Sequence, residues 1–284
     1  METMRDIKRR ISSVQNTQKI TRAMKMVAAS KLRKAQEKAE RARPFFNKTK
    51  KILSDVAHYT REIDEHPLII EREGDRILYI VITADRGLCG PYNSRIIKRA
   101  EQELQAQEEA KLLAIGQKGR NYFHRRDVEI ISEYLQLEDY PDFTFSRRIT
   151  EEVISLYKEE VVDKVRLIYT HFDSPLSQTV VNMSLLPVEK PEEEEGEARV
   201  DYLYEPEPHQ VLDVLLPQYI NNLLYSAQLE AKASEFGSRM TAMDAATDNA
   251  EEMIEELTLS YNRARQAEIT KEITEIVSGA EALK

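Results

Sequence analysis

The sequence predicts an α/β protein, with a long antiparallel coiled coil of N- and C-terminal helices plus a central Rossmann-like α/β domain. Both ends of the chain are rich in helix-forming residues and poor in glycine. The two ends also carry opposite charge. Residues 1–60 hold 16 Lys and Arg against 5 Asp and Glu, whereas residues 206–284 hold 6 against 14. Between them, short apolar runs alternate with helical stretches, as in α/β domains.

Residues 1–60 are expected to form the first coiled-coil helix. The segment contains no glycine and one proline, Pro44, which should bend the helix or break it one turn earlier because proline lacks an amide donor. An unbroken helix would be roughly 80 Å long. Apolar or small residues recur in heptad steps at Ile7, Ile11, Val14, Ala28, Leu32, Ala35, Ala39 and Ala42.

The central α/β domain is expected over residues 75–190. The continuous apolar run Ile77–Ala84 is typical of a buried parallel strand. The turn that follows it, residues 85–91, lies where α/β folds place their ligands. Further strands are expected at 111–115, 128–132, 165–172 and 178–186, and helices at 93–109, 116–122 and 148–160.

An acidic segment, residues 191–208, is expected to link this domain to the last helix, because it contains the run Glu192–Glu195 and ends in prolines that suit a helix start. Residues 209–284 should then form the second coiled-coil helix. A helix this long needs a packed partner, and the N-terminal helix is the expected one, in antiparallel orientation. Its apolar heptad positions include Ile269, Ile273, Ile276 and Ala280.

Composition argues against several classes of function. The net charge of −9 argues against nucleic-acid binding by the whole chain. The five histidines show no metal-ligand spacing and no catalytic constellation is visible, so neither a metal nor a cofactor is expected. The single cysteine, Cys89, is expected to be a structural thiol in a reducing compartment. No apolar run approaches the length of a membrane span.

Two features leave alternatives open. Polar residues interrupt the heptads at Gln18–Lys25 and Gly237–Asn249, which indicates either a frayed coiled coil or turns that face a partner. The turn at residues 85–91 is either a structural turn that also touches a partner or a nucleotide loop, although it lacks the known phosphate-loop spacings. The second interpretation would make the chain an α/β nucleotide-binding enzyme with a coiled-coil oligomerisation arm. A self-associating coiled-coil adaptor is the third possibility.

Four stretches, spread along the whole chain, resemble the gamma subunit of F-type ATP synthases. Ile7–Lys31 is similar to the N-terminal helix of that family, and Asp85–Gly90 to its loop after the first strand. Ala245–Ala250 and Asn262–Ala280 are similar to its C-terminal helix. The lack of a second cysteine and of an inserted central segment resembles the bacterial members of the family.

The resemblance implies a central rotor shaft that transmits torque between the membrane c-ring and the catalytic hexamer of three alpha and three beta subunits. It implies a non-catalytic subunit that couples ion (proton) flow to ATP synthesis or hydrolysis, with the epsilon subunit as a further partner. It also implies a peripheral location on the cytoplasmic face of the bacterial cell membrane. The positions implied to contact the beta subunits are Met24, Lys25, Arg86, Arg239, Gln266 and Thr270. Those implied to face the c-ring and epsilon are Tyr202, Tyr204 and Glu205.

Overall fold

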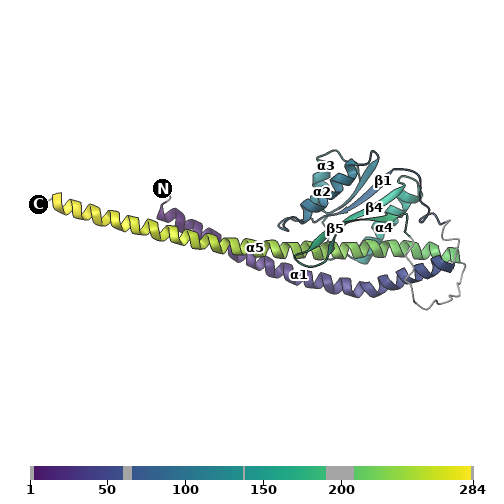
Figure 1. Ribbon diagram of the computed structural model, residues 1–284, viewed down its shortest axis with the longest axis horizontal. Helices are drawn as coiled ribbons and strands as arrows, with labels where there is room; N and C mark the ends of the chain where they lie inside the picture. The colour runs from purple at the N-terminus through teal and green to yellow at the C-terminus, as the bar shows by residue number, and fades with distance from the viewer. Residues whose placement is uncertain (1–2, 60–65, 137, 190–207, 283–284) are drawn as a thin grey trace. The chain divides into compact units, whose positions relative to one another are not determined.

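A computed structural model describes residues 3–59, 66–136, 138–189 and 208–282, and confirms the predicted fold class (Figure 1). Two compact units are present: a helical unit (residues 1–27 and 240–284) and a sheet unit (residues 28–239). The elements are α1 (Met4–Tyr59), β1 (Ile77–Ile82), α2 (Tyr92–Gln105), β2 (Ala110–Ile115), α3 (Gln117–His124), β3 (Ile130–Tyr134), α4 (Phe143–Lys158), β4 (Lys164–Phe172), β5 (Gln178–Leu186) and α5 (Pro208–Ala282).

The sheet unit is built on a five-stranded sheet with the order β3-β2-β1-β4-β5. The first four strands are parallel, and β5 is antiparallel at one edge. All six residues of β1, the central strand, are buried, as expected for a continuous apolar run. Ile82 lies beside Ile115 of β2, and Val81 beside Ile168 of β4. The carboxyl ends of these strands therefore meet at one edge of the sheet.

Alternate side chains of β1 enter two separate cores, one on each face of the sheet. Leu78 and Ile80 pack in the core that contains α4 and the adjoining parts of α1 and α5. Tyr79 and Val81 pack in the core that contains α2 and α3. Figure 1 shows α2 and α3 on the opposite face of the sheet from α5. The sheet-unit segments of α1 and α5 are thus part of the domain core, and are not a separate arm.

In the sheet unit, α1 continues through Pro44 to Tyr59, so the proline does not break the helix. Phe46 stacks on Tyr219 of α5 with ring centroids 6.1 Å apart. One turn further along, the Asn222 amide donates a buried hydrogen bond of 3.2 Å to the Thr49 hydroxyl. Packing against α5 on the C-terminal side of the proline therefore keeps the helix continuous.

Helix α4 begins five residues earlier than the sequence indicated. Its first turn is Phe143-Thr144-Phe145-Ser146, and the low helix propensity of these residues is why the sequence indicates a later start. Contacts with α5 override that propensity, since Phe143 packs edge-on against Tyr225 and the Ser146 hydroxyl donates to the Gln228 side chain at 2.8 Å. Helix α2 ends at Gln105, four residues before the expected end.

The helical unit pairs α1 with α5 in the predicted antiparallel orientation. The hydroxyls of Thr21 and Thr247 form a buried hydrogen bond of 2.8 Å, and Lys25 forms an ion pair with Asp244. Lys25 follows Thr21 along α1, whereas Asp244 precedes Thr247 along α5, so the two helices run in opposite directions. Among the predicted heptad residues, Ile7 is fully buried here.

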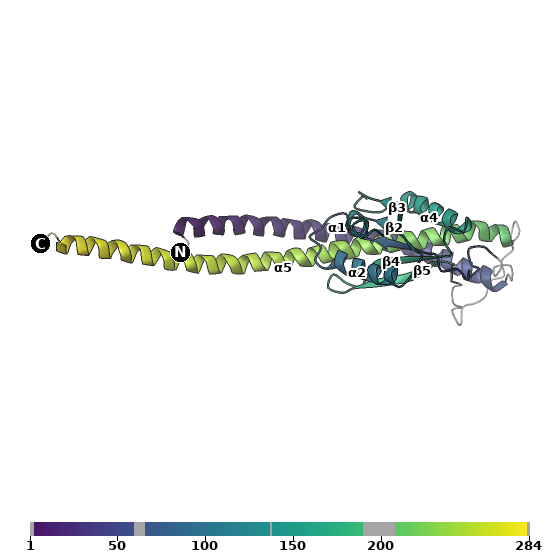
Figure 2. The ribbon, with the colours of Figure 1, turned by 90° about the horizontal axis from the view of Figure 1, so that it is seen from above.

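The heptad prediction for the last part of α5 was wrong. Ile269, Ile273 and Ile276 are 47%, 56% and 71% exposed. The register set by Thr21 and Thr247 would place Met4, the first residue of α1, opposite about residue 264 of α5. Residues beyond that point have no α1 turn beside them, and Figure 2 shows α5 continuing past the start of α1. The heptad spacing identified a row of apolar residues on this part of α5, but the expectation that α1 covers them was wrong.

An ion pair joins the amino ends of the two central parallel strands. Asp163, just before β4, accepts bonds of 2.8 and 2.6 Å from the Arg76 guanidinium, just before β1, and a third from the Arg76 amide. The pKa of the buried Asp163 carboxyl is lowered, mainly because the Arg76 side chain donates hydrogen bonds to the charged form. A Cβ at Gly74 would lie 2.0 Å from this carboxylate, so glycine is required there.

We predict that Asp163→Asn lowers the free energy of unfolding by about 2 kcal/mol at pH 7, since it removes charge-assisted bonds in a buried place. Because the folded-state pKa is depressed, the contribution of Asp163 is complete above the unfolded pKa of about 4 and disappears as pH falls through the folded value. Urea unfolding followed by circular dichroism between pH 7 and 3 measures both effects. Asp75→Asn, a change at an exposed carboxylate, is the control. Equal stability of the two variants would contradict the assignment.

Candidate functional site

The loop that follows β1, residues 83–91 (the β1 loop), lies at the carboxyl edge of the sheet. Cys89 is buried, whereas Arg86 is exposed and Leu88 is 64% exposed. Leu88 has a φ of 59°, in the left-handed region that bulky residues rarely adopt. A strained residue with an exposed apolar side chain is a candidate for a functional contact, because such strain persists only where the surroundings impose it.

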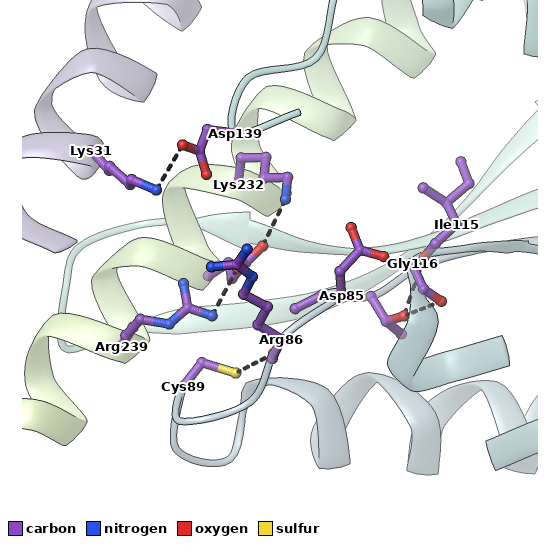
Figure 3. A network of polar contacts seen from close by, with 12 residues as sticks. Lys31, Asp85, Arg86, Cys89, Ile115, Gly116, Asp139, Lys232 and Arg239 are labelled. Carbon is purple, nitrogen blue, oxygen red and sulfur yellow. Dashed lines mark hydrogen bonds and ion pairs between the residues drawn. The ribbon is translucent and has the colours of Figure 1, made fainter. Parts of the chain in front are cut away.

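Two consecutive residues of α5 bind the backbone of the β1 loop. The Ser238 hydroxyl donates to the Cys89 carbonyl at 2.7 Å, and the Arg239 guanidinium donates to the Gly87 carbonyl at 3.3 Å. The Asn93 amide group adds a 3.2 Å bond to the Cys89 sulfur. Figure 3 shows the β1 loop and Arg239 facing each other. The loop therefore has a defined position on α5.

Arg239 forms an ion pair with an acidic residue of the same helix. Glu235 accepts a bond of 2.8 Å from Arg239 and one of 3.0 Å from Lys232, and the side chains of Arg239 and Glu235 are only 13% and 6% exposed. The resulting chain Lys232–Glu235–Arg239 follows one face of the helix. Its spacings of three and four residues are a signal that sequence reasoning could have used to find it.

Asp85 fills the position where an α/β nucleotide-binding protein would bind phosphate. Its carboxylate accepts a hydrogen bond of 2.9 Å from the backbone amide of Gln117, at the start of α3. It accepts a second one, of 3.1 Å, from the backbone amide of Gln136, after β3. A helix N-terminus at this edge is the usual anion site of such folds. Here a carboxylate of the chain itself takes the amides, which argues against the nucleotide-loop interpretation.

A cavity of about 400 Å³ lies beside these groups, between the ends of β1 and β3 and helix α5. Residues of both charges line the cavity. The basic residues are Arg148 and Lys232, and the acidic ones are Glu138, Asp142 and Glu235. Burial raises the pKa of the Cys89 thiol, which keeps it protonated and unreactive near neutral pH. Within the described residues, no group of three or more His, Cys, Asp or Glu is arranged to hold a metal ion.

The remaining predicted contact residues are spread over the chain. Met24 is half-buried, and Lys25 pairs with Asp244 inside the helical unit. Gln266 and Thr270 are exposed, one turn apart on α5, where the Thr270 hydroxyl donates to the Gln266 carbonyl. Within the sheet unit, Arg86 and Arg239 lie at the same place, because Arg239 binds the backbone of the β1 loop that carries Arg86. Sequence reasoning missed Ser238, whose role depends on a long-range contact. The predicted residues Tyr202, Tyr204 and Glu205 lie outside the described residues.

Comparisons with known proteins give a consistent result. A family model described as ATP synthase matches residues 3–283. The chain is 62% identical to the ATP synthase gamma chain of Halothermothrix orenii and 49% identical to that of Heliobacterium modesticaldum, with full coverage of both sequences in each case. It is also similar to a chain of the Tetrahymena thermophila mitochondrial ATP synthase central stalk and c-ring structure. That match has 29% identity and a TM-score of 0.61, over 80% of this chain and 99% of the other.

A second structural match supports the fold alone. A chain of the Euglena gracilis mitochondrial ATP synthase structure that contains OSCP, F1 and the c-ring has a TM-score of 0.71 with 17% identity. The match covers 99% of this chain and 94% of the other. The arrangement of long terminal helices around a mixed sheet is therefore retained where most of the sequence has changed.

We predict that Asp85→Ala lowers the free energy of unfolding by about 1 kcal/mol, because the exposed amides of Gln117 and Gln136 lose their hydrogen-bond acceptor. Chemical denaturation measures this, and Asp139→Ala, at a half-exposed ion pair with Lys31, is a control of the same residue type. We also expect calorimetric titration of the unchanged chain with ATP to detect no binding. ATP binding that Asp85→Ala abolishes would instead support the enzyme interpretation.

Proposed function

Because this chain belongs to the ATP synthase gamma-chain family, we propose that it is the central rotor shaft of a bacterial F-type ATP synthase. It would transmit torque between a membrane c-ring and a catalytic hexamer of alpha and beta subunits, coupling ion flow to ATP synthesis or hydrolysis. In this role the chain performs no chemistry of its own. ATP is made or hydrolysed in the hexamer, and the shaft determines which catalytic site changes state.

The observation that carries this proposal is the burial of α5 in the core of the sheet unit. Leu212, Leu216, Ile220 and Leu224, spaced by one turn, are fully buried in the same core as the strands. A force that turns the sheet domain therefore acts on the helix through continuous close packing, since protein interiors resist deformation. An oligomerisation arm would need no such burial.

The exposed end of α5 is the part that the hexamer would surround. Ile269, Ile273, Ile276 and Val277 give it an apolar surface that α1 does not cover. Gln266 and Thr270 lie on the same stretch of helix, and we place them, with Met24, Lys25, Arg86 and Arg239, among the contacts with the beta subunits. We assign Tyr202, Tyr204 and Glu205 to contacts with the c-ring and epsilon.

Torque transmission requires that these contacts be numerous but individually weak. Turning an asymmetric shaft presents different side chains to the three catalytic sites in succession. Each site is biased between tight and open states by the difference in contact free energy, and not by the total. A shaft that bound one orientation strongly would stop there.

The chain would be held at the membrane by its partners. Among the described helices, none is both long and apolar enough to cross a bilayer. A peripheral place on the cytoplasmic face of the bacterial cell membrane, reached through the c-ring and epsilon, is consistent with that finding.

We predict that this chain forms a complex with alpha and beta subunits in which one copy serves three alpha–beta pairs. With the hexamer fixed to a surface and a bead attached to the sheet unit, ATP should drive unidirectional rotation of the bead. Native mass spectrometry measures the stoichiometry, and single-molecule microscopy measures the rotation. The rotor proposal fails if the chain does not enter the hexamer or if the bead does not turn.

We also predict that Gln266→Ala lowers ATP hydrolysis by the reconstituted complex about fivefold, the effect of losing an interaction of about 1 kcal/mol. The fold should not change, because the side chain is exposed. Steady-state hydrolysis and circular dichroism measure the two effects. Glu268→Ala, two residues along and on a different face of α5, is the matched control. Unchanged turnover in Gln266→Ala would remove this residue from the contact set.

A further inference from the structure

Leu88 lies between two residues whose backbone carbonyl groups accept hydrogen bonds from side chains of α5. Gly87, on one side, accepts from the Arg239 guanidinium at 3.3 Å, and Cys89, on the other, accepts from the Ser238 hydroxyl at 2.7 Å. Leu88 itself has a φ of 59° and projects its side chain into solvent. Both donors belong to consecutive residues of one helix, so a single rigid element fixes the peptide groups on each side of the strained residue.

The side chains of Ser238 and Arg239 are poorly placed to meet a partner directly. Ser238 is 6% exposed, and the Arg239 side chain is 13% exposed. The Arg239 guanidinium is already paired with Glu235 at 2.8 Å, so a partner's carboxylate would have to displace an acid that is itself buried. The exposed residues at this place are Arg86 and Leu88 on the β1 loop.

We propose that Ser238 and Arg239 are positioning residues, which hold the β1 loop so that Arg86 and Leu88 meet the catalytic hexamer. The inference rests on the proposed function as a rotor shaft, and it changes the role of Arg239 from a contact to a support. Without the two bonds, Leu88 relaxes toward the ordinary backbone regions and carries Arg86 with it. Because Ser238 and Arg239 lie on α5, the position of the loop is tied directly to the orientation of the shaft.

A mutant cycle in the reconstituted alpha–beta complex separates support from contact. The single variants are Ser238→Ala and Arg239→Ala, and a loop-tip variant combines Arg86→Ala with Leu88→Ala. We expect each of the three to lower ATP hydrolysis about fivefold. Adding Ser238→Ala or Arg239→Ala to the loop-tip variant should then lower it no further, because the supporting bonds act only through the removed side chains.

Hydrogen exchange on the isolated chain measures the support itself. Backbone amides of residues 86–90 should exchange about fivefold faster in Ser238→Ala and Arg239→Ala than in the unchanged chain. Ser234→Ala is the matched control, since the Ser234 hydroxyl is also buried on α5 and also donates to a carbonyl, that of Thr170. This control should leave both loop exchange and hydrolysis at the unchanged values.

Three outcomes would overturn the inference. Multiplicative losses in the combined variants would mean that Arg239 or Ser238 acts on the hexamer independently of the loop. Full hydrolysis by the loop-tip variant, or unchanged loop exchange in both support variants, would mean that the loop is not presented by these bonds. Failure of the unchanged chain to assemble with the hexamer would overturn the proposed function instead, and the exchange measurement would still test the support of the loop.

Discussion

The rest of the structure depends on the burial of one stripe of α5 against the sheet. Tertiary packing, more than intrinsic propensity, is what makes a long helix persist in water. Here the stripe from Leu212 to Ala231 shares a core with β1, β4 and α4. That core fixes the rotation of α5 about its own axis, and so determines which residues face α1 and which face the β1 loop. The polar contacts at Ser238 and Arg239 exist because this packing points them toward the loop.

Charge and polarity have a second, more local role. The N-terminal segment is basic and the C-terminal segment is acidic, but the charged contacts that these helices make with distant residues are specific pairs. Lys25 meets Asp244, and Lys31 meets Asp139 of the loop before α4. Exposed pairs of this kind contribute little to stability. The buried Thr21–Thr247 pair is better suited to fixing the register of the two helices, as single polar core residues do in coiled coils.

Much of the fold could be predicted because its signals are local. The apolar run Ile77–Ile82, the glycine-poor α1 and the heptads around Leu32 are visible within a few residues of sequence. What could not be predicted depends on contacts between distant segments. The start of α4 at Phe143 is imposed by α5, and the exposure of Ile273 depends on the register between two helices. The same distinction applies to the candidate site. The motif of the β1 loop is a local signal that could be predicted, whereas the hydrogen bond between Ser238 and that loop joins distant segments and could not.

The end of α5 that α1 does not cover has a consequence for the newly synthesised chain before it binds its partners. A single helix with no packed neighbour is marginal in water, and this one exposes Ile269, Ile273 and Ile276 along its length. A newly synthesised chain that has completed both its cores would still carry an uncovered apolar rod, which is a surface prone to non-specific association. Its solubility in the cell would then depend on how soon assembly partners or chaperones cover that rod, so supply of this chain in excess of its partners should be harmful.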